Sequence, residues 1–94
     1  MDLDTIHNCH EKAVLSELFQ QLEQNSHLRG NDAVLADVAC VALNRLPARY
    51  ICHDVDLAFF QTVGERAETE RVVQEAVAFA FGFVQARNAM RARR

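Results

Sequence analysis

Proline and glycine are scarce in this chain, which has one proline and three glycines in 94 residues. Long loops without secondary structure are therefore not expected. Long apolar runs are also missing, and none approaches the ~20 residues that a membrane-spanning helix needs. The chain starts with the acidic Asp2 and Asp4, whereas a secretory signal starts with basic residues. We therefore expect a cytoplasmic protein that does not enter the membrane.

Cysteines are few, and their number is odd. Cys9, Cys40 and Cys52 cannot all pair, and a reducing cytoplasm keeps such thiols free. We expect Cys40 to be a small buried apolar residue. Cys52 precedes His53, but adjacent side chains on a strand point to opposite faces, so they cannot easily act as nucleophile and base. The sequence also lacks a glycine-rich phosphate loop and a Ser-His-Asp set, so we expect neither an enzyme nor a cofactor.

Hydrophobic residues make up half of the chain, which is enough for a core and too much for a disordered segment. A chain of this length forms one domain, residues 1–94, which buries only about 60–65% of its unfolded surface and gains from a partner. The net charge is −3, so binding to bulk nucleic acid is not expected. Four arginines lie in the last eight residues, where they either oppose the negative end of a helix dipole or bind an anion.

Apolar residues at helical spacing predict a first helix over about residues 7–24. Its stripe consists of Val14, Leu15, Leu18, Phe19 and Leu22. Turn-forming residues follow at positions 25–32 and predict a loop.

The second predicted helix starts near Asp32, with Asn31 or Asp32 as its N-cap. Its side chains are apolar on nearly all sides, which indicates a central helix that is covered on more than one side. It ends at Leu46, because the ring of Pro47 clashes with helical geometry at the preceding residue.

The third predicted helix covers about residues 65–91 and has two apolar stripes. The first consists of Val73, Ala76, Val77, Ala80 and Val84, and the second of Val72, Phe79 and Phe83, while Phe81 points elsewhere. This is more apolar surface than one small core can cover, and leaving it bare would expose several hundred Å². We therefore predict a symmetric homodimer with this helix in the interface. The predicted fold class is mainly α, with three principal helices and a short strand after the central one.

The short strand is predicted over residues 49–52, where tyrosine and isoleucine favour extended structure. Three or four residues cannot form a stable strand alone. The partner strand comes either from residues 57–63 or from a second copy of the chain. Residues 57–63 are also compatible with a helical turn.

Two groups of polar residues invite a functional interpretation. His7 and His10 would share a helix face, but a structural zinc site needs four ligands, and a fourth would have to come from His27, Cys52 or His53. We interpret this stretch as a solvated helix start and expect no metal. Asp37 lies inside the central apolar helix. It either faces solvent or needs a partner, which Arg45, Arg49 or the hydroxyl of Tyr50 could supply.

The break after the central helix gathers the residues that could hold a ligand. Arg45 falls in the last helical turn, and Asn44 can both donate and accept hydrogen bonds. Arg49 presents a planar fork that suits phosphate or a guanine edge, and Tyr50 offers a ring for stacking. An arginine beside an aromatic ring is the minimum set for an anionic aromatic ligand such as a nucleotide. In the structural alternative, which composition alone favours, Tyr50 packs in the core and Arg49 pairs with Asp37, Asp54 or Asp56.

Residues 37–53, DVACVALNRLPARYICH, resemble the signature of the late competence development ComFB family. That signature is Asp-Val/Ile, a small-residue helix, and then Ala-Leu-Asn-x-Leu-Pro-x-Arg-Tyr-Val/Ile. The matching positions are Asp37, Val38, Ala42, Leu43, Asn44, Leu46, Pro47, Arg49, Tyr50 and Ile51. A helix before the motif and a long helix after it also fit, so the resemblance spans most of the chain.

The resemblance implies a small, mostly helical bacterial protein of the cytoplasm that acts as a dimeric adaptor rather than as an enzyme. Some members of the family are receptors for cyclic dinucleotide second messengers. Others bind zinc through cysteines at Cys-x-x-Cys spacing just upstream of the aspartate. This chain has Asn31 and Val34 at those two places, so a zinc site of that type is not expected.

Two functions are compatible with the residues and the resemblance together. In the first, the protein is a dimeric receptor for a cyclic dinucleotide, above all cyclic di-GMP. Its ligand-binding residues are Asn44, Arg45, Arg49 and Tyr50, and the dimer sets two Arg49–Tyr50 pairs near a twofold axis. In the second, it is a helical protein–protein adaptor without a small-molecule ligand. The motif is then structural, and the long helix or its arginine tail contacts an unidentified protein partner.

Overall fold

The computed structural model describes residues 3–56 and 61–93 of the chain. In chain order the elements are η1 (Leu3–Thr5), β1 (His7–Asn8), α1 (Glu11–Gln21), η2 (Leu22–Leu28), α2 (Asp32–Asn44), β2 (Tyr50–Ile51), η3 (Asp54–Asp56) and α4 (Val63–Ala92), where η marks a 3₁₀ helix. Three α-helices dominate the described residues, and a short strand follows the central helix. The predicted mainly helical fold is therefore confirmed, while the homodimer stays a prediction.

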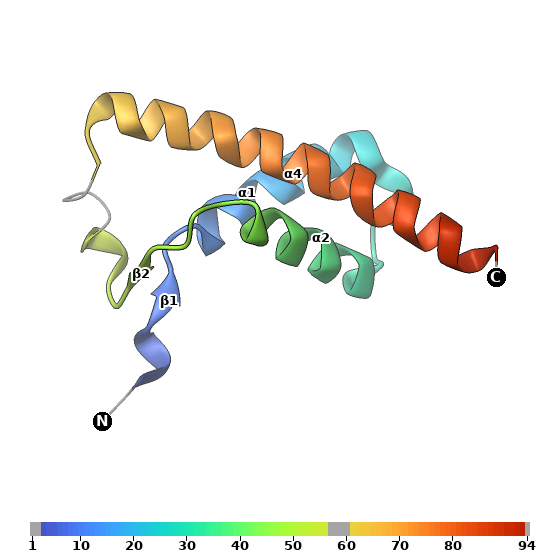
Figure 1. Cartoon of the computed structure of the whole chain (residues 1–94), viewed down its shortest axis with the longest axis horizontal. Coiled ribbons are helices and arrows are strands. Elements are labelled where there is room, and N and C mark those ends of the chain that lie inside the picture. Colours follow the sequence, from blue (N-terminus) through green and yellow to red (C-terminus); the bar gives the residue numbers. More distant parts are fainter. Residues whose placement is uncertain (1–2, 57–60, 94) are drawn as a thin grey trace.

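Helix α4 lies across α1 and α2, and both of its ends extend beyond them (Figure 1). It starts with a capping box: the Thr62 hydroxyl accepts the Glu65 N–H at 3.1 Å, and the Glu65 carboxylate accepts the Thr62 N–H at 3.1 Å. The Cα radius of gyration is 14.8 Å, against about 12 Å for a compact domain of this length. Both the projecting ends of α4 and the N-terminal segment η1–β1, which extends away from the helices, contribute to this excess (Figure 1).

The core lies where α1, α2 and α4 meet, and α1 contributes Val14, Leu18 and Leu22 to it. Leu15 and Phe19, which the predicted stripe of this helix included, are 46% and 62% exposed. Helix α1 contacts α2 and α4 along one side only, so the stripe is narrower than predicted. The helix also starts at Glu11 rather than at residue 7.

The first predicted stripe of α4 is confirmed, because Val73, Ala76, Val77, Ala80 and Val84 are all buried. Phe81, which was predicted to point elsewhere, is also buried, with 3% of its surface exposed. The reason is η2, in a region predicted to be a loop. This 3₁₀ helix lies against α4, since the His27 ring and the Asn25 side chain both hydrogen-bond to Gln85, one turn beyond Phe81. The buried sector of α4 is therefore wider than one stripe.

Helix α2 begins as predicted, with the Asn31 side chain accepting the Val34 N–H at 3.3 Å. Gly30 precedes it with a φ of 81°, a conformation that glycine adopts without steric cost. Val38, Ala39 and Ala42 are buried against α1 and α4. Cys40 is exposed, so its predicted burial is wrong, because neither of the two covering helices reaches its side of α2.

The strand β2 pairs antiparallel with β1, with His7 opposite Ile51 and Asn8 opposite Tyr50. The partner within the chain is therefore β1, which neither alternative had named, and pairing with a second copy stays a prediction. Residues 57–60 lie outside the described part of the chain, and Val63 begins α4. No helix in the described residues combines the length and apolar character that a membrane span requires.

Candidate ligand-binding site

The break after α2 is a tightened turn followed by Pro47. The N–H groups of Arg45 and Leu46 donate to carbonyls three residues back, at 3.1 and 3.3 Å. This 3₁₀ pattern is common where an α-helix ends. Leu46 is buried and anchors the turn in the core, whereas its neighbours Arg45 and Pro47 are exposed. The buried Leu46 therefore fixes the position of the turn, and polar side chains such as Arg45 extend from the turn into solvent.

Residues just before α1 hold the segment that follows Pro47. The Cys9 N–H donates to the Arg49 carbonyl at 2.7 Å, and the Asn8 side chain accepts the Arg49 N–H at 3.4 Å. The His10 ring donates to the Pro47 carbonyl at 3.1 Å. These bonds satisfy backbone groups that no helix pairs. They fix Arg49 relative to the core although its segment has little regular structure of its own.

Two hollows flank this segment, one on each side. The arginine hollow, of about 500 Å³, is lined by residues that include Arg45, Pro47, Arg49, Glu65, Glu68 and Val72. The tyrosine hollow, of about 410 Å³, is lined by residues that include Ile6, Glu11, Cys40, Asn44, Ala48 and Tyr50.

The four predicted ligand-binding residues are thus divided into two pairs. Arg45 and Arg49 face the arginine hollow, while Asn44 and Tyr50 face the tyrosine hollow. Arg49 and Tyr50 separate because consecutive residues in extended backbone point to opposite sides. One ligand confined to one hollow therefore meets an arginine pair or the tyrosine, but not all four side chains. Their role in binding stays a prediction.

In the arginine hollow, Arg45 lies over an aromatic ring of α4. Its guanidinium carbon is 3.7 Å from the centroid of the Phe79 ring. Such a contact contributes about 0.5–1 kcal/mol at an exposed site. It partly covers the second predicted stripe of α4, in which Phe79 and Phe83 stay 42% and 45% exposed. The ring contact therefore already orients Arg45, which also lines the hollow.

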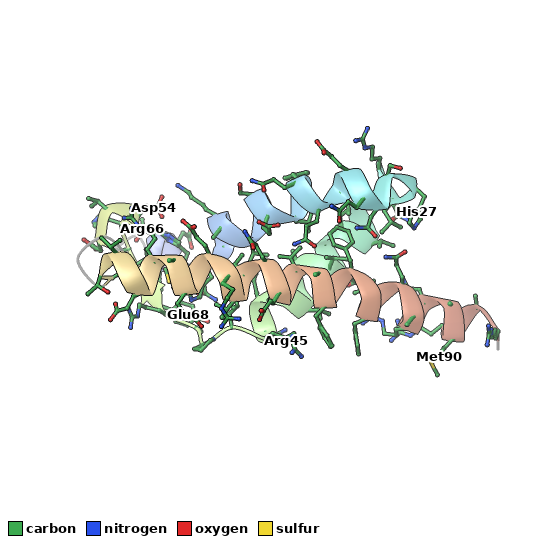
Figure 2. The ribbon with its side chains drawn as sticks, turned by 90° about the horizontal axis from the view of Figure 1, so that it is seen from above. His27, Arg45, Asp54, Arg66, Glu68 and Met90 are labelled. Atoms are coloured by element: carbon green, nitrogen blue, oxygen red, sulfur yellow. The ribbon has the colours of Figure 1, made fainter. Side chains whose placement is uncertain are left out.

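The opposite wall of the arginine hollow is acidic and comes from the first turns of α4. Glu65 and Glu68 line it, and Figure 2 shows Glu68 and Arg45 on the same side of α4. Arg71 hydrogen-bonds to Glu68 and, at 2.6 Å, to Glu75. The hydrogen bond from Arg71 lowers the pKa of Glu68, so this carboxylate is charged at neutral pH. The hollow thus offers both cationic donors and anionic acceptors.

The sequence prediction missed this acidic wall. Glu65, Glu68 and Val72 follow one another at helical spacing and continue the stripe of Phe79. That periodicity was a usable signal, but nothing in the sequence indicated that this part of α4 would face Arg45 and Arg49. The contact depends on the path of the chain between β2 and α4.

In the tyrosine hollow, Tyr50 is 67% exposed. The alternative prediction that it packs in the core is therefore wrong. The strand β2 has only two residues, and its inward position is taken by Ile51, which is 7% exposed. The ring of Tyr50 is consequently available to a ligand or to another protein.

Asp37 pairs with a residue that the sequence did not suggest. Its carboxylate accepts a hydrogen bond from Arg87 of α4 at 3.0 Å, rather than from Arg45, Arg49 or Tyr50. The Asp37 side chain is 54% exposed, so the alternative prediction that it faces solvent is also met in part. The Arg87 guanidinium lies 5.9 Å from the Phe83 ring centroid and joins α2 to the second stripe of α4.

The histidines near the N-terminus have structural contacts. The two ring nitrogens of His7 lie 2.7 Å from the Thr5 carbonyl and 2.8 Å from the Asp54 carboxylate. His7 belongs to β1 and His10 precedes α1, so they do not share a helix face as predicted. Within the described residues, no three His, Cys, Asp or Glu side chains are grouped closely enough to hold a metal.

Comparison with known proteins identifies a family. The family described as "Late competence development protein ComFB" matches residues 7–88, a range that runs from β1 into the last turns of α4. It includes the break at Pro47, all residues that line the arginine hollow, and those that line the tyrosine hollow except Ile6. No curated protein and no solved structure matched the chain.

Proposed function

We propose that this chain, which belongs to the late competence development ComFB family, is a non-enzymatic receptor that binds a cyclic dinucleotide in the arginine hollow. Family membership makes it a bacterial, competence-related regulatory protein. The ligand, the site and the dimeric adaptor role are our proposal. They rest on the residues that line the hollow and on the charge pattern of α4.

The observation that carries the proposal is the pairing of two arginines and two glutamates in one hollow of about 500 Å³. Small-molecule sites typically have volumes of about 300–1,000 Å³. Arginine donates to O6 and N7 of guanine, and the guanine N1–H and amino group match a carboxylate acceptor. Arg49 with Glu65 or Glu68 therefore suits a guanine base better than a bare phosphate, which the carboxylates would repel. Arg45 is placed to receive the phosphate.

The other reactive groups around the hollow favour binding over catalysis. Burial raises the pKa of the Cys9 thiol, with the charge of Arg49 acting in the opposite direction, so this thiol stays protonated at neutral pH. The His10 ring is engaged by the Pro47 carbonyl. A protonated thiol and an engaged imidazole are a poor nucleophile and base. We therefore propose a receptor whose output is a change in association with other proteins.

Titration calorimetry with cyclic di-GMP tests the proposal. Arg49→Ala is expected to weaken binding about tenfold or more, because it removes a charge-assisted hydrogen bond. Arg29→Ala is the matched control, because Arg29 is an exposed arginine in the turn before α2. Tyr50→Ala distinguishes between the two hollows as binding sites. It leaves the affinity for cyclic di-GMP unchanged if the ligand occupies the arginine hollow alone. Absence of heat and of competition at about 100 µM ligand excludes cyclic di-GMP.

A protein–protein adaptor without a small-molecule ligand is the second candidate function. The stacked pair of exposed rings on α4, Phe79 and Phe83, favours it, with ring centroids 5.7 Å apart. In this case Arg49→Ala leaves partner binding intact, and removal of residues 91–94 weakens partner capture. Thermal shift with a panel of cyclic dinucleotides discriminates between the two functions, because a ligand that binds only the folded protein raises its Tm.

A further inference from the structure

Helix α4 covers one side of the layer that α1 and α2 form, and in Figure 2 it lies in front of both. On α1, Glu17 and Gln20 line a hollow that is shared with α4. Leu15 and Phe19 each lie two residues from Glu17, and at about 100° per residue they point to nearly the opposite side. Both side chains are exposed, so the described residues leave this side of α1 uncovered.

The corresponding side of α2 is also open. Arg45 lies over Phe79 of α4, and Leu43, two residues before Arg45, therefore points away from α4. Cys40 lies one turn before Leu43 and is exposed. The tyrosine hollow joins the two helices on this side, because Cys40 and Leu43 line it together with Glu11 of α1.

These observations define an apolar strip along the contact between α1 and α2, on the side away from α4. We call it the seam face, and it consists of Ile6, Leu15, Phe19, Cys40, Leu43 and Tyr50. The tyrosine hollow, of about 410 Å³, lies at one end, where Glu11 starts α1. Phe19 lies eight residues further along α1, which is about 12 Å along the helix axis. A bound amphipathic helix spans a similar length between its anchors at i and i+7.

The charge of this half of the molecule indicates which kind of helix fits the seam face. Residues 3–56 contain eight acidic and four basic residues, which gives −4 with histidine neutral. Three of the four bases are directed elsewhere, because Lys12 pairs with Asp54, and Arg45 and Arg49 line the arginine hollow. The layer of α1 and α2 is therefore acidic around its open apolar strip.

Two acidic side chains lie next to the strip. Glu23 follows Phe19 at i+4, and Asp32 lies eleven residues, or about three turns, before Leu43 on the same side of α2. Both are exposed, and neither side chain forms a hydrogen bond or an ion pair within residues 3–56 and 61–93. Arg29, in the turn before α2, offsets one of these charges. The strip thus ends in carboxylates that are open to a cationic partner.

We propose that the seam face is the docking surface for a basic amphipathic helix of another protein. The apolar stripe of that helix covers Leu15 and Phe19 and inserts one side chain into the tyrosine hollow. Its lysines or arginines face Glu23 and Asp32. An acidic helix would bury the same apolar surface but would meet like charges, so charge selects the partner. A second copy of this acidic layer is disfavoured for the same reason. The face lies away from the arginine hollow, so the proposal does not rest on the proposed cyclic dinucleotide.

Cys40 makes occupancy of the seam face measurable. Its thiol is exposed on the face, whereas the exposed Cys52 lines neither the arginine hollow nor the tyrosine hollow. The probe is a synthetic helical peptide of about 18 residues with leucines at i, i+3, i+4 and i+7 and lysines elsewhere. One control peptide has glutamates in place of the lysines, and another has the basic composition in scrambled order. At about ten times its dissociation constant, the basic peptide should slow alkylation of Cys40 about tenfold relative to Cys52 in the same sample. Mass spectrometry reads both thiols.

Paired variants locate the site in fluorescence anisotropy with the labelled basic peptide. Phe19→Ser should weaken binding about tenfold, while Val55→Ser, at an exposed apolar residue of η3, should leave it unchanged. Glu23→Lys should weaken binding more than Glu70→Lys, which makes the same charge change at an exposed glutamate of α4. All four residues are exposed, so the variants keep the core intact.

Three results would overturn the proposal. They are unprotected Cys40 at high micromolar basic peptide, equal protection by the acidic or scrambled peptide, and equal protection of Cys40 and Cys52. Equal losses in the Phe19 and Val55 variants would also contradict it. Because these measurements contain no cyclic dinucleotide, a failed docking surface and a failed cyclic di-GMP titration are separate results.

Discussion

At the scale of single residues, His7 contacts Asp54, which is far away in the sequence, and this contact depends on the charge of the imidazole ring. Its two ring nitrogens face two oxygen acceptors, the Thr5 carbonyl and the Asp54 carboxylate. Only the imidazolium can donate to both at once, because the neutral ring has a single N–H. The hydrogen bond to Thr5, followed by that to Asp54, raises the pKa of His7. The Asp54 carboxylate also accepts a hydrogen bond from Lys12, which is the main cause that lowers its pKa.

We predict that protonation of His7 stabilises the paired strands β1 and β2, which hold the segment after Pro47 in place. A raised pKa in the folded state means that this contribution is fully present below about pH 6.5 and is lost as the pH rises through the raised value. The lowered pKa of Asp54 means that its contribution is present at neutral pH and is lost only in acid. NMR titration of the His7 ring should give a midpoint above about 6.5, and Asp54→Asn should lower it. A wild-type midpoint at or below this value would contradict the prediction.

The residues of the break illustrate what could be predicted from sequence at this scale. Pro47 and the side chains around it were recognised as exceptional, and Arg45 and Arg49 do line one hollow. The partner of Asp37 was not found, because Arg87 is fifty residues away and neither the composition nor the spacing of the two residues connects them. The sequence was compatible with a ligand-binding Tyr50 and with a buried Tyr50, and only the exposure seen in the structure excludes the buried one. Side-chain partners across the fold depend on tertiary contacts that periodicity does not contain.

At the scale of secondary structure, periodic elements were predicted better than short ones. The bounds of α2 and α4 differ from the predicted ones by at most two residues, because their apolar spacing extends over several turns and caps mark their starts. The strand β1 was missed entirely. His7 and Asn8 are polar and too few to show alternation. The strand β1 exists because Asn8 and Cys9 hydrogen-bond to Arg49, at least forty positions away. Such a strand is a consequence of the fold rather than of local propensity.

The start of α4 offers a test at this scale, because its first turn carries Glu65 of the arginine hollow. Thr62→Ala removes the side-chain acceptor of the capping box and is expected to cost about 1 kcal/mol of unfolding free energy. Thr62→Ser keeps the hydroxyl and should cost much less. Urea unfolding of the three proteins, at one protein concentration, measures the difference. Equal losses for alanine and serine would mean that the cap does not stabilise the helix, and that another contact of Thr62 does.

At the scale of the whole molecule, the extended shape and the exposed aromatic rings of α4 both favour association with a second copy. The radius of gyration exceeds that of a compact chain, and α4 projects at both ends beyond the other helices (Figure 1). A projecting helix with two exposed aromatic rings, Phe79 and Phe83, leaves apolar surface that a second copy of the chain would cover. The sequence suggested a dimer from the amount of apolar surface alone. It could not specify the orientation, because that depends on which side of α4 the three-helix core leaves open.

A dimeric receptor predicts that ligand binding and dimerisation are coupled. If the proposed dimer brings the two arginine hollows close together, the ligand's phosphates relieve the repulsion between the two Arg45 side chains, and cyclic di-GMP must tighten the dimer. Linkage requires dimerisation to raise the affinity for the ligand by the same factor, for which about tenfold is typical. We expect saturating cyclic di-GMP to lower the dimer dissociation constant by this factor in sedimentation experiments. Calorimetry over a range of protein concentrations should show a matching gain in ligand affinity. Arg49→Ala should abolish the coupling, while Arg29→Ala, at an exposed arginine in the turn before α2, should retain it. A ligand that binds tightly and leaves the dimer dissociation constant unchanged would show that each hollow is complete within one chain.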